Sequence, residues 1–155
     1  MKLSVLGADW LLASSELVEN VQNAVDPPPN QGLGLGMAPI GAQVTAVAPT
    51  ELTVNVSAAL TLQSGYQIGQ VQQPIEEAIE AYLLTVRKEW DTNTSTTGVA
   101  YAADVYLARI TAAIVGVAGV VNATNVQLNG GTADLVLTEN GTTQQVPVIG
   151  TVTLT

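Results

Sequence analysis

The stretch that decides the fold is residues 51–88, ELTVNVSAALTLQSGYQIGQVQQPIEEAIEAYLLTVRK. Apolar and polar residues alternate in its first part, which is typical of a half-buried β-strand. After Ser64 and Gly65 the apolar residues recur at helical spacing, which predicts an amphipathic helix. The apolar face of that helix consists of Val71, Ile75, Ala78, Ile79, Tyr82, Leu83 and Val86. A strand and a helix with one apolar face each predict a sheet packed against helices.

The flanking segments extend this pattern in both directions. Residues 42–47 also alternate, and the turn-like residues 49–51 predict that they form a hairpin with residues 52–62. Downstream we expect a second helix over residues 105–115. Three more strands are expected at residues 120–128, 132–138 and 145–155, separated by turns at 129–131 and 139–141. Pro147 lacks an N–H and therefore favours a sheet edge or a bulge. The chain is predicted to be an α+β fold, one antiparallel sheet against two helices.

The first part of the chain has a different composition. Residues 1–26 predict a strand and one helix, with Ser14 or Ser15 as the N-cap, too little to bury a face by themselves. Three prolines after Asp26 end the helix, and residues 27–41 are rich in glycine and proline. We expect residues 1–26 to be the remnant of an upstream domain, 27–41 a connection, and 42–155 a C-terminal α+β domain.

Composition excludes much chemistry. The 155 residues include no His and no Cys, so a Cys/His zinc site, a thiol nucleophile and a histidine base are impossible. Four Lys+Arg against thirteen Asp+Glu give a net charge of −9, which repels nucleic acids and anionic lipids. We therefore predict no catalytic residue, no cofactor, no metal, and no nucleic-acid, membrane or small-molecule partner.

A few residues still suggest a site. Glu76, Glu77 and Glu80 form a carboxylate cluster that is typical of a solvated helix face. An enzyme using Glu77 or Glu80 would need a concave pocket that encloses a carboxylate. Trp10 and Trp90 each lie beside a helix end, where a large ring either packs on the local core or anchors a partner; we predict an interface role for both.

Five segments, taken in order, resemble the C-terminal half of baseplate J proteins of contractile phage tails, prophages and phage-tail-like bacteriocins. They are DPPPNQGLGLGMAPIGAQVTAV (26–47), LTLQSGY (60–66), QQPIEEAIEAYL (72–83), VYLARITAAIVGVAGVVNATNVQLNGG (105–131) and QVPVIGTVTL (145–154). The resemblance implies a wedge component that links neighbouring wedges into a ring around the tail hub and takes part in triggering sheath contraction. It implies no catalytic residues.

The resemblance also implies partners and a location. Other baseplate and tail proteins are the expected partners, together with further copies of this chain. Assembly would take place in the bacterial cytoplasm, and the final location would be the baseplate of a virion or tail-like particle. A second interpretation, a cell-surface or carbohydrate-binding β-rich module, shares the acidic charge and the turns rich in Asn and Thr.

Overall fold

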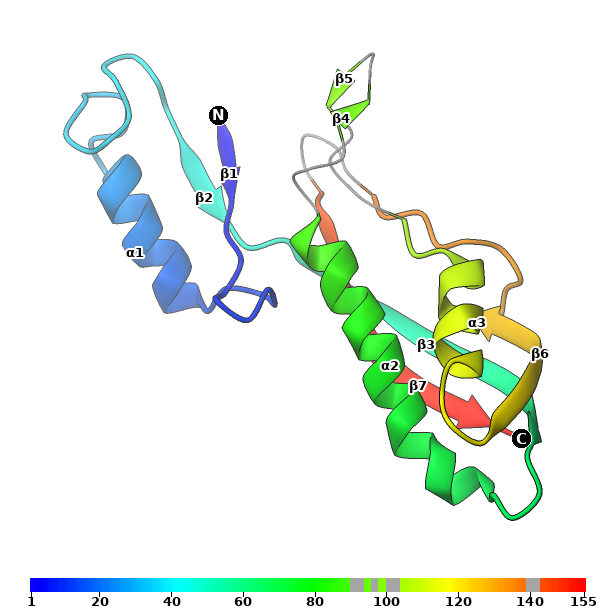
Figure 1. Ribbon diagram of the computed structural model, residues 1–155. Helices are drawn as coiled ribbons and strands as arrows, with labels where there is room; N and C mark the ends of the chain where they lie inside the picture. The colour runs from blue at the N-terminus through cyan, green and yellow to red at the C-terminus, as the bar shows by residue number, and fades with distance from the viewer. Residues whose placement is uncertain (90–93, 96–97, 100–103, 139–142) are drawn as a thin grey trace. The chain divides into compact units, whose positions relative to one another are not determined.

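The computed structural model describes residues 1–89, 94–95, 98–99, 104–138 and 143–155 (Figure 1). The elements in chain order are β1 (Lys2–Ser4), α1 (Ser15–Val25), β2 (Thr45–Val47), β3 (Thr50–Leu62), α2 (Ile68–Lys88), β4 (Thr94–Ser95), β5 (Gly98–Val99), α3 (Leu107–Val115), β6 (Val120–Leu128) and β7 (Gln145–Leu154). The described residues form two compact units. Unit 1 contains residues 1–50 and the described part of 139–145, and unit 2 contains the described parts of 51–138 and 146–155.

Unit 1 is built from two short parallel strands and one helix. β1 pairs with β2 in the register Lys2 to Thr45, and α1 packs against β2. As expected, Ser14 caps α1, because its Oγ accepts a hydrogen bond of 3.2 Å from the Leu17 amide. The predicted hairpin between residues 42–47 and 52–62 is wrong, since β2 pairs with β1 and β3 belongs to another sheet. Alternation shows which side chains face inward, and it does not show which strand is the neighbour.

Unit 2 contains a three-stranded sheet in the order β6-β3-β7. β6 is antiparallel to β3, with Val56 opposite Leu128. β7 runs in the same direction as β3, because the Thr155 amide donates to Ala58 and the Thr155 carbonyl accepts from Leu60. Figure 1 shows the arrows of β3 and β7 pointing the same way. The α+β class is confirmed, with a mixed sheet, and β7 with Pro147 lies at its edge as predicted.

Helix α2 matches the predicted face closely. Its buried apolar residues are Val71, Ile75, Ile79, Leu83 and Val86. The helix begins at Ile68, where the Gln70 side chain accepts from the Gln67 amide at 2.8 Å. Pro74 lies inside α2, beyond the first turn, where its missing N–H removes one hydrogen bond of the helix.

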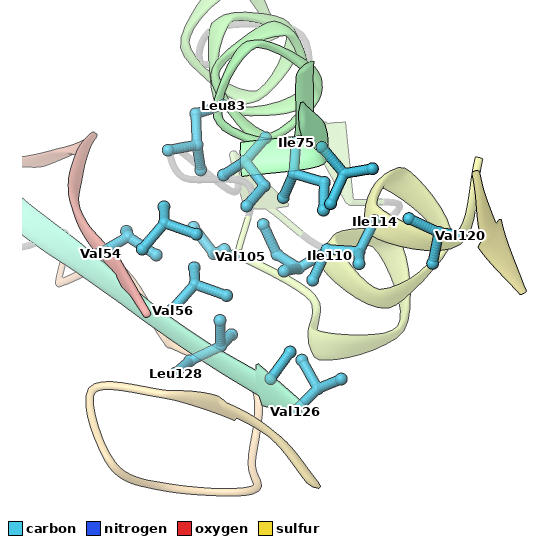
Figure 2. Packing of buried hydrophobic residues seen from close by; sticks show 14 residues of the cluster. Val54, Val56, Ile75, Leu83, Val105, Ile110, Ile114, Val120, Val126 and Leu128 are labelled. Carbon is cyan, nitrogen blue, oxygen red and sulfur yellow. The ribbon is translucent and has the colours of Figure 1, made fainter. Parts of the chain in front are cut away.

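The core of unit 2 lies between the two helices and one face of the sheet (Figure 2). Ile75 and Leu83 of α2 point toward Val54 and Val56 of β3, and Ile110 of α3 fills the space beside them. All five are at most 2 % exposed. Fully burying an aliphatic side chain contributes about 1.5–3 kcal/mol, so this cluster dominates the stability of unit 2.

Two further predictions concern the segment after β6. The turn at residues 129–131 is confirmed, since Asn129 and Gly130 have φ values of 50° and 78°. The strand predicted at 132–138 is wrong: Leu135 makes only an isolated bridge with Val105, through hydrogen bonds of 2.9 and 3.0 Å. The turn predicted at 139–141 lies outside the described residues. Among the described helices, none has the length and apolar character that crossing a bilayer requires.

Candidate interaction surfaces

The connection at residues 27–41 is held in place by a buried carboxylate. Asp26 is 1 % exposed, and its two oxygens accept from the Gly32 amide at 2.8 Å and the Val44 amide at 2.9 Å. The Gln22 side chain donates to Val44 and accepts from Ala46, so it ties α1 to the strand that follows the connection. Two side chains of one helix end therefore secure both ends of the glycine-rich segment.

The same segment satisfies the exposed end of α1. The Met37 amide donates to Ala24 at 3.1 Å, and the Ala38 amide donates to Val25 at 2.8 Å. These bonds occupy carbonyls that the last turn of a helix leaves unpaired. Gly36 lies against this end so closely that a Cβ would meet the Val25 carbonyl. The connection is thus a folded loop docked on α1.

This loop presents large apolar side chains to solvent. Leu33, Leu35, Met37 and Ile40 are 59 %, 64 %, 83 % and 83 % exposed, and we call them the apolar loop patch. No charged residue occurs between positions 27 and 50. Exposed apolar side chains grouped on an ordered segment are typical of an interaction site. The glycines at 32–36 led us to interpret residues 27–41 only as a connection. The four large apolar side chains between and after these glycines are the sequence signal for an interaction site that this interpretation missed.

Of the two tryptophans predicted to have an interface role, the structure describes Trp10. Trp10 lies in a tight loop, where its amide donates to Gly7 at 3.0 Å, and its side chain is 40 % exposed. Its φ of 62° is unusual for a bulky residue, and such backbone strain is characteristic of functional positions. Its interface role remains a prediction. Trp90 lies outside the described residues.

The carboxylate cluster lies on the outer side of α2. Glu77 is exposed and accepts from Gln73 at 2.9 Å, and Glu76 accepts from Gln72. The three glutamates line an open hollow between α2 and β7 with a volume of about 590 Å³. The enzyme hypothesis required a pocket that encloses Glu77 or Glu80. Glu77 is exposed, and Glu80 is 39 % exposed and pairs with Arg87 at the side of an open hollow.

Arg87 is the residue of this region that sequence reasoning misassigned. A cation in the last turn of an amphipathic helix is normally solvated, yet the Arg87 side chain is 1 % exposed and pairs with Glu80, which is 39 % exposed. Its second terminal nitrogen donates to the Pro147 carbonyl at 2.9 Å. The spacing Ile79, Leu83, Arg87 continues the apolar face at intervals of four, so the helical period contained the signal. Arg87 therefore fastens α2 to the edge strand β7.

Similarity to known proteins identifies the family. Residues 54–155 match the Baseplate J-like protein C-terminal domain. The chain belongs to this family. Across 152 residues, 98 % of its length, the chain is 28 % identical to the phage-like element PBSX protein XkdT of Bacillus subtilis strain 168. It is also 38 % identical over 79 residues to the uncharacterized protein YqbT of the same strain.

The chain spans only 38 % of XkdT and 22 % of YqbT by length in these comparisons. The Baseplate J-like C-terminal match begins inside β3 and includes the hollow between α2 and β7. The apolar loop patch precedes the matched range. The two surfaces thus belong to different parts of the chain, one inside the family domain and one before it.

Proposed function

We propose that this chain is a structural component of a contractile phage-tail-like baseplate. Its contribution would be to link neighbouring wedge subunits around the central hub. The observation that carries the proposal is the match of residues 54–155 to the Baseplate J-like C-terminal domain. A relative that is named as a protein of a phage-like element supports it.

The surface chemistry is compatible with assembly. Only 11 % of the residues are charged, so few charges must be desolvated when this chain meets a partner. The apolar loop patch supplies side chains that gain from burial, and the docked loop loses little conformational entropy on binding because it is already ordered. Other tail proteins, and further copies of this chain, are the proposed partners.

The proposed domain organisation follows the earlier expectation. Residues 1–26 would belong to a domain separate from the C-terminal one, residues 27–41 would connect the two, and 42–155 would be the C-terminal domain, although β2 of that range pairs with β1 in unit 1. The separate assignment of residues 1–26 is supported by α1, which has no buried residue. Packing within unit 1 alone therefore contributes little to the stability of this helix. The proposed location is the baseplate of the assembled particle, after assembly in the bacterial cytoplasm.

Removal of the segment tests the proposed role. The coding sequence for residues 1–155 would be deleted from the prophage or tail locus, and released particles would be inspected by electron microscopy. We expect sheath and tube without a complete baseplate, and restoration by the intact gene supplied in trans. Particles with normal baseplates after deletion would contradict the proposal.

Location separates this function from the cell-surface alternative. Antibody against the chain should label one end of purified tail particles. Label on the envelope of producing cells, with none on particles, would instead favour the cell-surface or carbohydrate-binding module.

A further inference from the structure

The hollow between α2 and β7 has an apolar floor and an acidic rim. Ala81 and Leu84 of α2 and Ile149 and Val152 of β7 form the floor. Glu76, Glu77 and Glu80 form the rim; no lysine or arginine lines the hollow among the described residues. We call this feature the α2–β7 groove.

Two side chains of α2 donate hydrogen bonds to carbonyls of β7. At one end Gln72 donates to the Val152 carbonyl at 3.0 Å, and at the other Arg87 donates to the Pro147 carbonyl at 2.9 Å. Pro147 itself has no N–H to offer. These contacts protect both ends of the edge strand from pairing with other chains. Between them, residues 148–151 have no neighbouring strand on the outer side in the described part of the chain.

The rim contains an incompletely satisfied acceptor. One Glu80 oxygen pairs with Arg87, whereas Glu80 Oε2 and Arg87 Nε are both buried without a hydrogen-bond partner among the described residues. A lysine or arginine at the mouth of the groove would offset the negative charge of Glu76, Glu77 and Glu80.

We propose that the α2–β7 groove binds a short extended segment of a partner protein that carries a basic residue next to an aliphatic one. The extended form follows from the open strand edge at residues 148–151, to which a short segment adds as a strand. The aliphatic side chain fits the floor, and the basic side chain fits the rim. A second copy of this chain is a poor occupant of the groove, because it offers no free extended basic segment among the described residues. Arg87, Lys88 and Arg109 lie in helices, and Lys2 lies in β1, which is already paired with β2.

Synthetic peptides on the full chain test the proposal. The probe is a capped octapeptide of alternating lysine and valine, titrated by calorimetry and by amide chemical shifts. Three variant peptides test the contributions of charge, apolar contact and strand pairing separately. One has glutamate in place of lysine, one has serine in place of valine, and one has a central proline that prevents strand pairing. We expect the parent to shift amides of residues 148–152 and of α2, and each variant peptide to bind at least about tenfold more weakly.

A matched pair of variants separates the groove from general charge attraction. Glu76→Gln with Glu77→Gln should weaken binding of the parent peptide about tenfold. Glu16→Gln with Glu19→Gln removes the same charge from α1 and should leave binding within about twofold. The proposal would be overturned if both pairs of substitutions weakened binding equally, or if the amide shifts fell outside residues 148–152 and α2. Tight binding of the proline peptide, or no binding of the parent peptide, would overturn it as well. The groove stands on the geometry of unit 2, so neither its failure nor its success decides the baseplate role.

Discussion

At the scale of single residues, Arg87 is the most consequential side chain of unit 2. It is a buried cation, and Glu80 and the Pro147 carbonyl are its partners. Desolvating a guanidinium is expensive, and the pairing offsets this cost only while both partners are in place. The residue therefore joins α2 to β7 at a point where the sheet has an edge.

Replacing Arg87 tests this joint. Arg87→Met leaves the Pro147 carbonyl without a donor and Glu80 without a cation, and Glu80 regains part of its hydration because it is partly exposed. We expect a loss of about 2 kcal/mol in the free energy of unfolding, measured in urea. The exposed neighbour offers a control, since Lys88→Met should change stability little. Equal effects of the two substitutions would show that the buried contacts contribute nothing.

Tyr82 predicts a dependence of stability on alkaline pH. Burial raises the pKa of its hydroxyl above 10.0, although a hydrogen bond from the Tyr106 amide and the charge of Arg109 partly oppose this. The folded chain thus keeps the proton to a higher pH than the unfolded chain does. The contribution of Tyr82 to the free energy of unfolding is complete below about pH 10, and it is lost as the pH rises through the raised pKa.

Tyr82→Phe should make the fall of unfolding free energy above about pH 10 shallower. The measurement is urea unfolding at a series of alkaline pH values, accompanied by tyrosinate absorbance of folded chain. Chain kept unfolded in urea provides the control titration. An unchanged slope in the variant would contradict the assignment.

At the scale of elements, the turn before β6 depends on a glycine. Gly119 has φ of 94°, and a Cβ there would meet the Tyr66 ring. Its carbonyl accepts from the Gln63 amide at 2.8 Å, which links the end of β3 to the start of β6. Both the backbone conformation and the close approach therefore require glycine.

Gly130 makes a matched comparison, because its φ is 78° and a Cβ there meets nothing within 4 Å. We expect Gly130→Ala to cost about 1 kcal/mol from backbone strain alone. Gly119→Ala should cost about 2–3 kcal/mol, because Tyr66 must also move. Thermal or urea unfolding of both variants checks this, and an equal loss in both would show that Tyr66 yields freely.

The helices and strands also show which structural features a sequence pattern can predict. The apolar face of α2, the Ser14 cap and the turn at Asn129 were predictable, because each depends on residues near one another in the chain. The pairing of β2 with β1 and the direction of β7 were not, because strand partners are chosen by contacts across the whole unit. The predicted strand at 132–138 failed for the same reason: its only described bridge is to Val105.

At the scale of the whole molecule, the apolar loop patch and the core serve different purposes. The patch is exposed, so replacing it costs the folded state little, whereas assembly would bury it. Leu35→Ser, Met37→Ser and Ile40→Ser combined should leave the free energy of unfolding within about 0.5 kcal/mol of the natural chain. Binding to neighbouring tail proteins, measured by calorimetry or pull-down, should weaken at least about tenfold.

Two exposed valines outside the patch provide the control. Val121 and Val136 are also largely exposed, and they lie in unit 2. Val121→Ser with Val136→Ser should leave the same binding unchanged. If the control variant loses as much affinity as the patch variant, or the patch variant binds like the natural chain, the loop is not an assembly contact.

By itself the sequence determined the α+β class, the apolar face of α2 and the absence of His and Cys chemistry, and it restricted Pro147 to a sheet edge or a bulge. These follow from local periodicity and from which residue types are present. Only the tertiary structure decided the burial of Arg87, the mixed sheet, the docked loop and the groove between α2 and β7. Each of these brings together residues distant in the chain, and their contact energies depend on a geometry that no short sequence window encodes.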